Sequence, residues 1–364
     1  MFRALVVGDS FMNTQVVVEI VQKVLNKRGI NIDIRGVEWE FKGYQRGRLM
    51  GIKRELREFA GDPHKLEPLV KDVDVLLVHV APVTEGVLKA GGSLKVVGCA
   101  RGAPINVDVD AATMFGIPVI YTPGRNAEAV ADHTLGLILA QARNIVKAHT
   151  SLKNGIWSDE LYDYRFCGSE LSGKTLGLIG LGRVGSEVAK RAQAFKVRVI
   201  SYDPYVNEEY MKSVGVEKVD LETLLKESDF ISIHARLTPE TRHMIGEKEL
   251  KLMKPTAILI NTARGEIVDE RSLIKALEEG WIAGAALDVF ESEPIPPEHP
   301  LLRIDNVIVN PHISGASRET VHRSAEMLAE DVANVLSGKR PRYCANPEVF
   351  LSTNQTFKRV PAQT

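Results

Sequence analysis

Three side chains that could carry acid–base chemistry each follow a short apolar run of the chain. Arg264 lies in the segment INTARG, Glu293 in LDVFESEP and His312 in VNPH. A histidine that is oriented by a carboxylate can donate a proton to a carbonyl oxygen and take it back. An arginine is always charged and planar, so it can polarise that carbonyl and bind a neighbouring carboxylate. Together the three predict chemistry on a 2-oxo acid, although each residue taken singly is more simply explained as a solvated loop residue.

A glycine motif predicts a second site. Residues 174–185 read KTLGLIGLGRVG, a G-x-G-x-x-G that follows one apolar run and precedes a helical pattern. In such a motif the first glycine allows a tight turn, the second lets backbone N–H groups approach a pyrophosphate, and the third lets helix and strand pack closely. An ordinary strand-to-helix turn can show the same bare pattern. We assign dinucleotide binding to the six consecutive residues Gly180, Leu181, Gly182, Arg183, Val184 and Gly185.

An acidic residue indicates which dinucleotide is bound. Asp203 follows the apolar run at residues 197–202 and lies 18 positions after Gly185. A carboxylate there can accept hydrogen bonds from the adenosine ribose, and it repels the additional phosphate of NADP. Asp203 could also be a turn residue before Pro204. Together with the glycines it favours NAD as the cofactor, and we assign His234, at the end of a later apolar run, to the same site.

These residues need a scaffold that brings the ends of several strands together. Short runs rich in Val, Ile and Leu alternate with helical patterns along almost the whole chain, as is typical of parallel sheets covered by helices on both faces. The length of 364 residues suggests two domains. We therefore expect an α/β fold with two doubly wound domains and two long helices, near residues 127–146 and 318–336. The polar segment 42–62 is expected to form a surface helix and loop, and the end of the chain is expected to be loose.

Composition excludes several classes of function. The chain has 46 Lys and Arg against 47 Asp and Glu, so it lacks the cationic excess that nucleic-acid binding needs. No run of 18 apolar residues could span a bilayer, and the N-terminus lacks the apolar region of a signal peptide. Three widely spaced cysteines fit a reducing compartment, and no Cys/His cluster has metal-ligand spacing. We expect a cytoplasmic protein with no metal and with no nucleic-acid or membrane partner.

At these residues the chain resembles a known family. Residues 95–336 are similar to the D-isomer-specific 2-hydroxyacid dehydrogenases, which include phosphoglycerate dehydrogenases and glyoxylate/hydroxypyruvate reductases. Besides the glycine motif, the matching segments are LKVVG at 94–98, TPG at 122–124, VADH at 130–133, LTPET at 237–241, NTARG at 261–265, DV at 288–289 and NPH at 310–312. The resemblance implies NAD-dependent interconversion of a D-2-hydroxy acid and its 2-oxo acid.

The family pattern also implies roles for individual residues. It makes His312 the acid/base, Glu293 its partner and Arg264 the cation that polarises the substrate. Reduction is then expected to slow as the pH rises through the titration of His312, because it consumes the protonated imidazole. Asp288 and the backbone of Thr262 and Ala263 are implied to hold the nicotinamide carboxamide.

The family organisation implies a Rossmann NAD-binding domain at residues 122–319. A discontinuous, flavodoxin-like substrate domain would comprise residues 1–121 and 320–364, with a cleft between the two domains. Homodimers formed through the cofactor domain are usual in such proteins. Because the sequence ends soon after its last long helix, we do not expect the regulatory domain that many phosphoglycerate dehydrogenases carry.

The loop at residues 99–106 departs from the family pattern. It reads CARGAPIN, whereas family members commonly have a Gly-Val-Gly-type loop followed by Asp before the Asn. We assign binding of the substrate carboxylate to the backbone of Gly102 and Ala103, because Pro104 has no N–H to offer. Arg101 could read an acidic or hydroxylated substrate tail, or it could form a salt bridge to a neighbouring helix.

The exact function stays open at this point. Arg236 stands where the family commonly has proline, and a cation there could favour a sugar acid or a phosphorylated acid. The enzyme could be a short phosphoglycerate dehydrogenase, or a reductase of glyoxylate, hydroxypyruvate or a sugar-derived acid. A different class, NAD-sensing interaction proteins that resemble the C-terminal-binding-protein corepressors, can keep all three catalytic residues. Rapid consumption of NADH would separate an enzyme from such a sensor.

Overall fold

The computed structural model describes residues 1–40 and 56–351. The chain forms two compact units, one made of Met1–Arg125 with Ser317–Thr364 and the other of Asn126–Ala316. The chain thus crosses between the units twice, after Arg125 and after Ala316. The expected boundaries were at residues 122 and 320, a few positions away. Most of the expected surface helix at 42–62 lies outside the described residues.

The first unit contains a five-stranded parallel sheet with the order β2-β1-β3-β4-β5. This is the flavodoxin-like order, in which the direction of winding reverses between β1 and β3. The strands are β1 (Phe2–Gly8), β2 (Ile32–Glu38), β3 (Val75–Val78), β4 (Val96–Cys99) and β5 (Val119–Tyr121).

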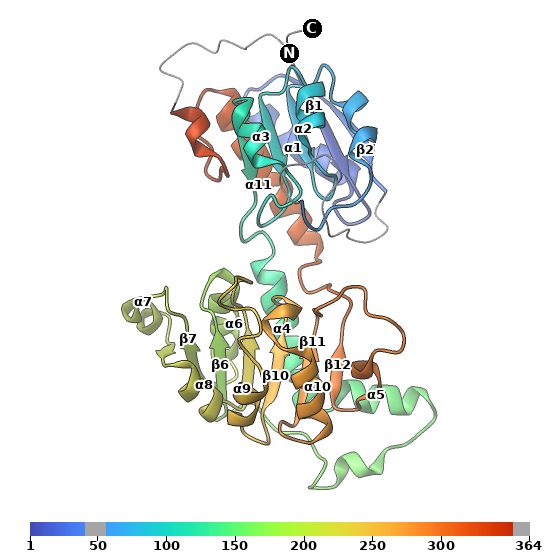
Figure 1. Ribbon diagram of the computed structural model, residues 1–364, viewed down its shortest axis with the longest axis vertical. Coiled ribbons are helices and arrows are strands. Elements are labelled where there is room, and N and C mark those ends of the chain that lie inside the picture. Colours follow the sequence, from blue (N-terminus) through green and yellow to red (C-terminus); the bar gives the residue numbers. More distant parts are fainter. Residues whose placement is uncertain (41–55, 352–364) are drawn as a thin grey trace. The chain divides into compact units, whose positions relative to one another are not determined.

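Helices cover both faces of this first sheet (Figure 1). They are α1 (Thr14–Lys27), α2 (Glu85–Ala90), α3 (Val109–Met114) and α11 (Arg318–Leu336). Alternation along β1 explains the two cores, because Ala4 and Val6 pack with α1 and α11 while Leu5 and Val7 pack with α2 and α3. The C-terminal helix therefore completes the N-terminal unit.

The second unit contains a seven-stranded parallel sheet with the order β12-β11-β10-β9-β6-β7-β8. Read from β8, this is the Rossmann order with a further strand at the far edge, and winding reverses between β6 and β9. The strands are β6 (Thr175–Ile179), β7 (Arg198–Tyr202), β8 (Glu217–Lys218), β9 (Phe230–Ile233), β10 (Ile258–Asn261), β11 (Gly284–Leu287) and β12 (Val307–Val309).

Two layers of helices enclose the second sheet (Figure 1). Helices α4 (Ala127–Ala142) and α6 (Arg183–Gln193) pack on one face, and α8 (Leu221–Glu227), α9 (Glu247–Leu252) and α10 (Glu270–Glu278) pack on the other. Short helix α7 (Glu208–Ser213) precedes β8, and α5 (Ile145–Lys153) follows α4. Because every strand is parallel, all of the strand ends that carry candidate residues lie at one edge of the sheet.

The helical pattern expected at 127–146 is interrupted in the structure. Helix α4 ends at Ala142, and α5 begins at Ile145. Asn144 between them has φ 54°, a left-handed conformation that asparagine tolerates better than most residues. The long helix expected at 318–336 is present as α11.

The described part of the C-terminal tail packs against the rest of the first unit. Asn346 is buried; its side chain accepts a hydrogen bond from the Val119 N–H at 2.8 Å and donates to the Ile117 carbonyl at 2.9 Å. Residues 352–364 lie outside the described residues. No helix among residues 1–40 and 56–351 is both long enough and apolar enough to cross a bilayer.

Candidate active site

The three catalytic candidates follow neighbouring strands of the second sheet. Arg264 lies just after β10, Glu293 in the loop after β11 and His312 just after β12. The structure brings Glu293 and His312 together, with His312 Nδ1 2.8 Å from Glu293 Oε2. The other oxygen of Glu293 accepts a hydrogen bond from the Phe290 N–H at 3.0 Å. The side chain of His312 is 26% exposed and that of Glu293 is 16% exposed, so the pair is partly buried but still accessible to a small molecule.

The hydrogen-bond partners assign the tautomer of His312. An ionised carboxylate can only accept, so Nδ1 carries the hydrogen of this contact and Nε2 is the nitrogen on the side of the ring away from Glu293. The backbone of His312 has φ 55°, and its N–H donates to the Asp288 carbonyl at 2.9 Å. A left-handed residue at a strand end is strained and persists because neighbours hold it.

Asp288 is one of those neighbours. Its carboxylate is buried and accepts hydrogen bonds from the N–H groups of Ile313 at 2.9 Å and Ser314 at 2.8 Å. Both oxygens thus anchor the loop that carries His312. The sequence analysis gave Asp288 a role toward the nicotinamide and did not foresee this structural one.

Arg264 is positioned by a residue that the sequence analysis missed. Asn261 Oδ1 accepts from the Ala263 N–H at 3.0 Å, and its Nδ2 donates to the Arg264 carbonyl at 2.9 Å. Arg264 Nη1 in turn donates to the Ala263 carbonyl at 2.7 Å. An asparagine followed two residues later by a turn is a local signal for this fold-back. The Ala263 N–H is therefore engaged by the protein, and the Thr262 hydroxyl contacts that of Thr134 at 3.1 Å.

The glycine motif has the geometry that a dinucleotide requires. Gly180 has φ 98°, and a methyl group on it would lie 2.8 Å from the Ala235 nitrogen. A methyl group on Gly185 would overlap the Gly180 carbonyl oxygen, whereas one on Gly182 would stand in open space. Gly182 is also the N-cap residue of α6, and it makes no side-chain hydrogen bond to the first turn of the helix. Open space in front of such a helix end fits a pyrophosphate.

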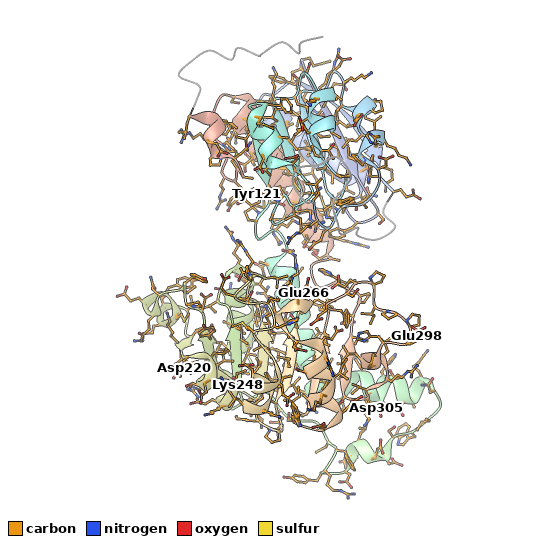
Figure 2. All side chains as sticks on the ribbon, viewed as in Figure 1. Tyr121, Asp220, Lys248, Glu266, Glu298 and Asp305 are labelled. Carbon is orange, nitrogen blue, oxygen red and sulfur yellow. The ribbon has the colours of Figure 1, made fainter. Side chains whose placement is uncertain are left out.

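A groove beside the motif fits the adenosine half of the same cofactor. It has a volume of about 560 Å³ and is lined by Tyr202, Asp203, Pro204, Lys218, Val219, Asp220 and Thr223. Figure 2 labels Asp220 at the start of α8. Asp203 Oδ2 accepts from the Leu181 N–H at 2.9 Å, so it ties the glycine loop to the groove. The residues present therefore fit NAD.

His234 lies against the glycine loop at Gly180. Its backbone would touch a side chain at Gly180, and its Nε2 lies 2.9 Å from the Ser232 hydroxyl. Burial lowers the pKa of His234 to about 3, so the ring is uncharged at neutral pH. Arg236 follows in the same loop and is exposed.

The predicted substrate loop lies at the end of β4 in the first unit. Gly102 and Ala103 are exposed, and within residues 1–40 and 56–351 their N–H groups have no protein acceptor. Arg101 is buried, and its guanidinium forms an ion pair with the Glu58 carboxylate and donates to the Glu58 carbonyl at 3.1 Å. Of the two interpretations of Arg101, the structure shows the salt bridge, with a loop residue as the partner in place of a helix.

A second carboxylate–imidazole pair lies at the winding reversal of the first sheet. Asp9 follows β1 and His79 follows β3, and Asp9 Oδ2 lies 2.6 Å from His79 Nδ1. His79 Nε2 lies 3.4 Å from Arg125 Nη2, and because arginine only donates, this nitrogen must accept. Burial lowers the pKa of His79 to about 4, against the opposing effect of Asp9. In contrast to His312, His79 is almost fully buried.

No metal centre accompanies these sites in the part of the chain that the structure describes. Among residues 1–40 and 56–351, no group of three or more His, Cys, Asp or Glu side chains is arranged to hold a metal ion.

Comparison with known proteins identifies the family. The sequence model of the "D-isomer specific 2-hydroxyacid dehydrogenase, NAD binding domain" matches residues 135–314. A glyoxylate reductase of Korarchaeum cryptofilum is 46% identical over 281 residues, which cover 77% of this chain and 85% of that protein. A D-3-phosphoglycerate dehydrogenase of Methanocaldococcus jannaschii is 48% identical over 272 residues, which cover 74% of this chain and 51% of that protein.

A solved structure of similar fold holds the cofactor. The NAD-complexed D-isomer specific 2-hydroxyacid dehydrogenase from Lactobacillus delbrueckii ssp. bulgaricus has a TM-score of 0.76 and 25% identity, and the match covers 94% of this chain and 100% of that one. The second unit thus contains the NAD-binding domain of an oxidoreductase.

The chain belongs to the D-isomer-specific 2-hydroxyacid dehydrogenase family. It is an NAD-dependent enzyme that acts on the CH–OH group of 2-hydroxy acids. The fold class, the enzyme class and the cofactor expected from the sequence are confirmed.

Proposed function

We propose that the protein reduces a small 2-oxo acid, with glyoxylate as the best substrate, and that His312 is the acid/base of the reaction. The hydrogen bond between His312 Nδ1 and Glu293 Oε2 carries this proposal. The similarity to glyoxylate reductases supports the choice of substrate. NAD, when bound in its reduced form, supplies the hydride.

His312 moves the proton that the carbonyl oxygen gains or loses. Its Nε2 faces away from Glu293, and the Glu293 carboxylate orients the ring and stabilises the imidazolium. In reduction the imidazolium donates its Nε2 proton to the carbonyl oxygen, and in oxidation the neutral ring takes the hydroxyl proton.

Arg264 binds the substrate and polarises its carbonyl. A 2-oxo acid carries its carboxylate and its carbonyl on adjacent carbons, so one planar guanidinium can donate to both. The fold-back made by Asn261 limits the freedom of the loop, which lowers the cost of holding Arg264 in place.

The first unit contributes substrate recognition in this proposal. The exposed N–H groups of Gly102 and Ala103 are donors suited to a carboxylate. Arg101 is ion-paired with Glu58, so this one of the two cations that could read a charged tail is already neutralised. The ion pair supports a substrate without a second charge over a phosphorylated one, with Arg236 as the remaining exposed cation.

The test follows NADH oxidation by absorbance with glyoxylate, hydroxypyruvate, phosphohydroxypyruvate and pyruvate. NADPH is measured in parallel. We expect the highest kcat/KM with glyoxylate and NADH. Preference for phosphohydroxypyruvate would make the enzyme a phosphoglycerate dehydrogenase, and tight NADH binding without turnover of any 2-oxo acid would overturn the proposal in favour of a sensor.

We also propose that the enzyme is a homodimer formed through the second unit. Helix α5 and the segment after it expose large apolar side chains, among them Trp157 at 76%, Tyr162 at 96% and Tyr164 at 93%. An exposed apolar group of this kind is typical of a protein interface. Because it lies on the NAD-binding unit, a second copy of the chain is the occupant that fits the family organisation.

Light scattering coupled to size-exclusion chromatography tests the dimer. The wild type is expected to elute as a dimer and the double variant Trp157→Ser, Tyr164→Ser as a monomer. Tyr205→Ser is the matched control, because Tyr205 is 92% exposed elsewhere on the same unit. A monomeric wild type would contradict the proposal.

A cytoplasmic location is the third part of the proposal. All three cysteines, Cys99, Cys167 and Cys344, are free thiols, and Cys167 is exposed. Free exposed thiols persist in a reducing compartment. Fractionation of cells that express the full chain tests this expectation, and recovery outside the cytoplasm would contradict it.

A further inference from the structure

Four side chains close to Glu293 form a linked array that the proposed mechanism does not use. His243 Nε2 lies 2.8 Å from Glu291 Oε1, and His299 Nε2 lies 3.0 Å from Glu270 Oε1. Two hydrogen bonds join Glu270 and Glu291, and in each of them the backbone N–H of one residue donates to the carboxylate of the other. The Glu270 N–H donates to Glu291 Oε1 at 3.1 Å, and the Glu291 N–H donates to Glu270 Oε2 at 3.3 Å. We call His243, Glu291, Glu270 and His299 the acid–imidazole array.

The array holds the loop that carries Glu293. Glu291 precedes Glu293 by two residues, and Phe290, next to it, donates its N–H to Glu293 Oε1. Glu270 is the first residue of α10, and its carboxylate reaches Glu291 on one side and His299 on the other. The ring of His299 packs edge-on against Phe290, with the ring centres 6.4 Å apart. The first two residues of the turn at 290–293 are thus held in place, Phe290 by the ring of His299 and Glu291 by Glu270 of α10.

The same turn lies against the loop that carries Arg264. A side chain at Gly265 would overlap the backbone of Phe290, so the two loops are in direct backbone contact. Glu266, labelled in Figure 2, continues from Gly265, and its carbonyl accepts from the His243 N–H at 2.8 Å. The array and the turn therefore contact the residues that directly follow Arg264.

Packing alone does not explain why residue 299 is a histidine. The carboxylate of Glu270 can only accept, so His299 Nε2 carries the hydrogen of their contact. His299 Nδ1 is then a buried nitrogen without a hydrogen-bond partner in the described part of the chain. Such an unpaired polar atom destabilises a fold, and phenylalanine would fill the same place beside Phe290 without it.

We propose that Glu270 and His299 are positioning residues for the catalytic pair. They hold the turn at residues 290–293 against the Arg264 loop, so that Glu293 meets His312 Nδ1 with the right geometry. This inference rests on the proposed role of Glu293 and His312. It predicts that loosening the array changes the pH profile of reduction and the rate of the chemical step without changing NADH binding.

The first test compares Glu270→Ala with Glu270→Gln. Glutamine keeps one oxygen that can accept from the Glu291 N–H, and its amide N–H can donate to His299 Nε2 in the other tautomer, so it is expected to retain most of the activity. For Glu270→Ala we expect kcat for glyoxylate to fall about tenfold, in the range seen for outer-shell residues. We also expect the alkaline limb of the pH profile for reduction to move about 0.5–1 unit lower, because a misplaced Glu293 stabilises the imidazolium less. Glu278→Ala, at the other end of α10, is the control and should match the wild type.

A second variant guards against loss of folding. His299→Phe removes the donor to Glu270 together with the unpaired nitrogen, so Tm is expected to stay within a few degrees while kcat falls and the pH profile moves. A purely structural role would leave the pH profile unchanged in both variants, and that result overturns the inference. His312→Gln separates the two proposals. If it is as active as the wild type, the proposed function fails; if it is inactive while Glu270→Ala and His299→Phe behave as the wild type, only the array inference fails.

Discussion

Replacement of His79 by glutamine should remove a defined part of the enzyme's acid sensitivity. His79 is buried against Asp9 and Arg125, and burial lowers its pKa from 6.5 to about 4. Between these two values the unfolded chain binds a proton at this position and the folded chain does not. The folded state is therefore destabilised as the pH falls from 6.5 toward 4, and no penalty arises above pH 6.5.

The size of the effect follows from the two pKa values. Each unit of separation corresponds to about 1.4 kcal/mol, so the penalty reaches about 2–3 kcal/mol at pH 4.5. Glutamine cannot titrate, yet it offers an amide N–H to Asp9 and a carbonyl oxygen to Arg125. The His79→Gln variant should keep most of the native contacts and lose the pH-dependent penalty. Asp9, whose pKa is lowered, titrates below this window.

Native-state hydrogen exchange measured by mass spectrometry reports the opening free energy of the strands involved. Peptides from β1 and β3 are followed at pH 7.0, 5.5 and 4.5, with correction for intrinsic exchange. The wild type should lose about 2–3 kcal/mol more than His79→Gln between the extremes. His64→Gln is the control, because the His64 side chain is 79% exposed in the same unit. Parallel curves for the wild type and His79→Gln would refute the assignment of His79 as a buried neutral imidazole.

Two further variants test the cofactor site. Asp203→Asn removes the charge of the carboxylate that accepts from the Leu181 N–H. The Kd for NADH in a fluorescence titration should rise about tenfold, and the discrimination against NADPH should shrink. An unchanged Kd for both cofactors would show that Asp203 is not part of the site. Gly185→Val places a side chain against the Gly180 carbonyl, so it should abolish NADH binding and lower the Tm. The methyl group of Gly182→Ala enters open space, so this variant should fold normally but bind NADH more weakly. Equal NADH affinity in Gly182→Ala and the wild type would contradict the assignment of a pyrophosphate in front of α6.

Much of the fold could be predicted because its signals are local. Strands buried on both faces appear as apolar runs, and the glycine motif marks its own turn. Strands β2 and β8 lack this signal: β2 is an edge strand with several exposed residues, and β8 has two exposed residues, Glu217 and Lys218. Neither has the continuous apolar sequence that a central strand needs.

The residues that we propose as catalytic could be predicted from the sequence, and the contacts around them could not. Arg264, Glu293 and His312 are marked by their place after strands. Hydrogen bonds join Asp288 to residues 313–314 and Glu270 to His299. The partners in these bonds are 25 to 29 positions apart in the sequence. Arg101 and Glu58 are 43 positions apart. Such pairs depend on how the loops fold together, and no spacing in the sequence encodes them.

The role of His312 as the acid/base is tested most directly by measuring both the activity and the NADH affinity of His312→Gln. Because proton transfer by a positioned side chain contributes about 10²–10⁴-fold, glyoxylate reduction should fall by at least about a hundredfold. The Kd for NADH should stay within about twofold, since His312 is outside the groove and the glycine motif. A variant that binds NADH normally and still reduces glyoxylate within tenfold of the wild type would contradict the assignment of His312 as the acid/base.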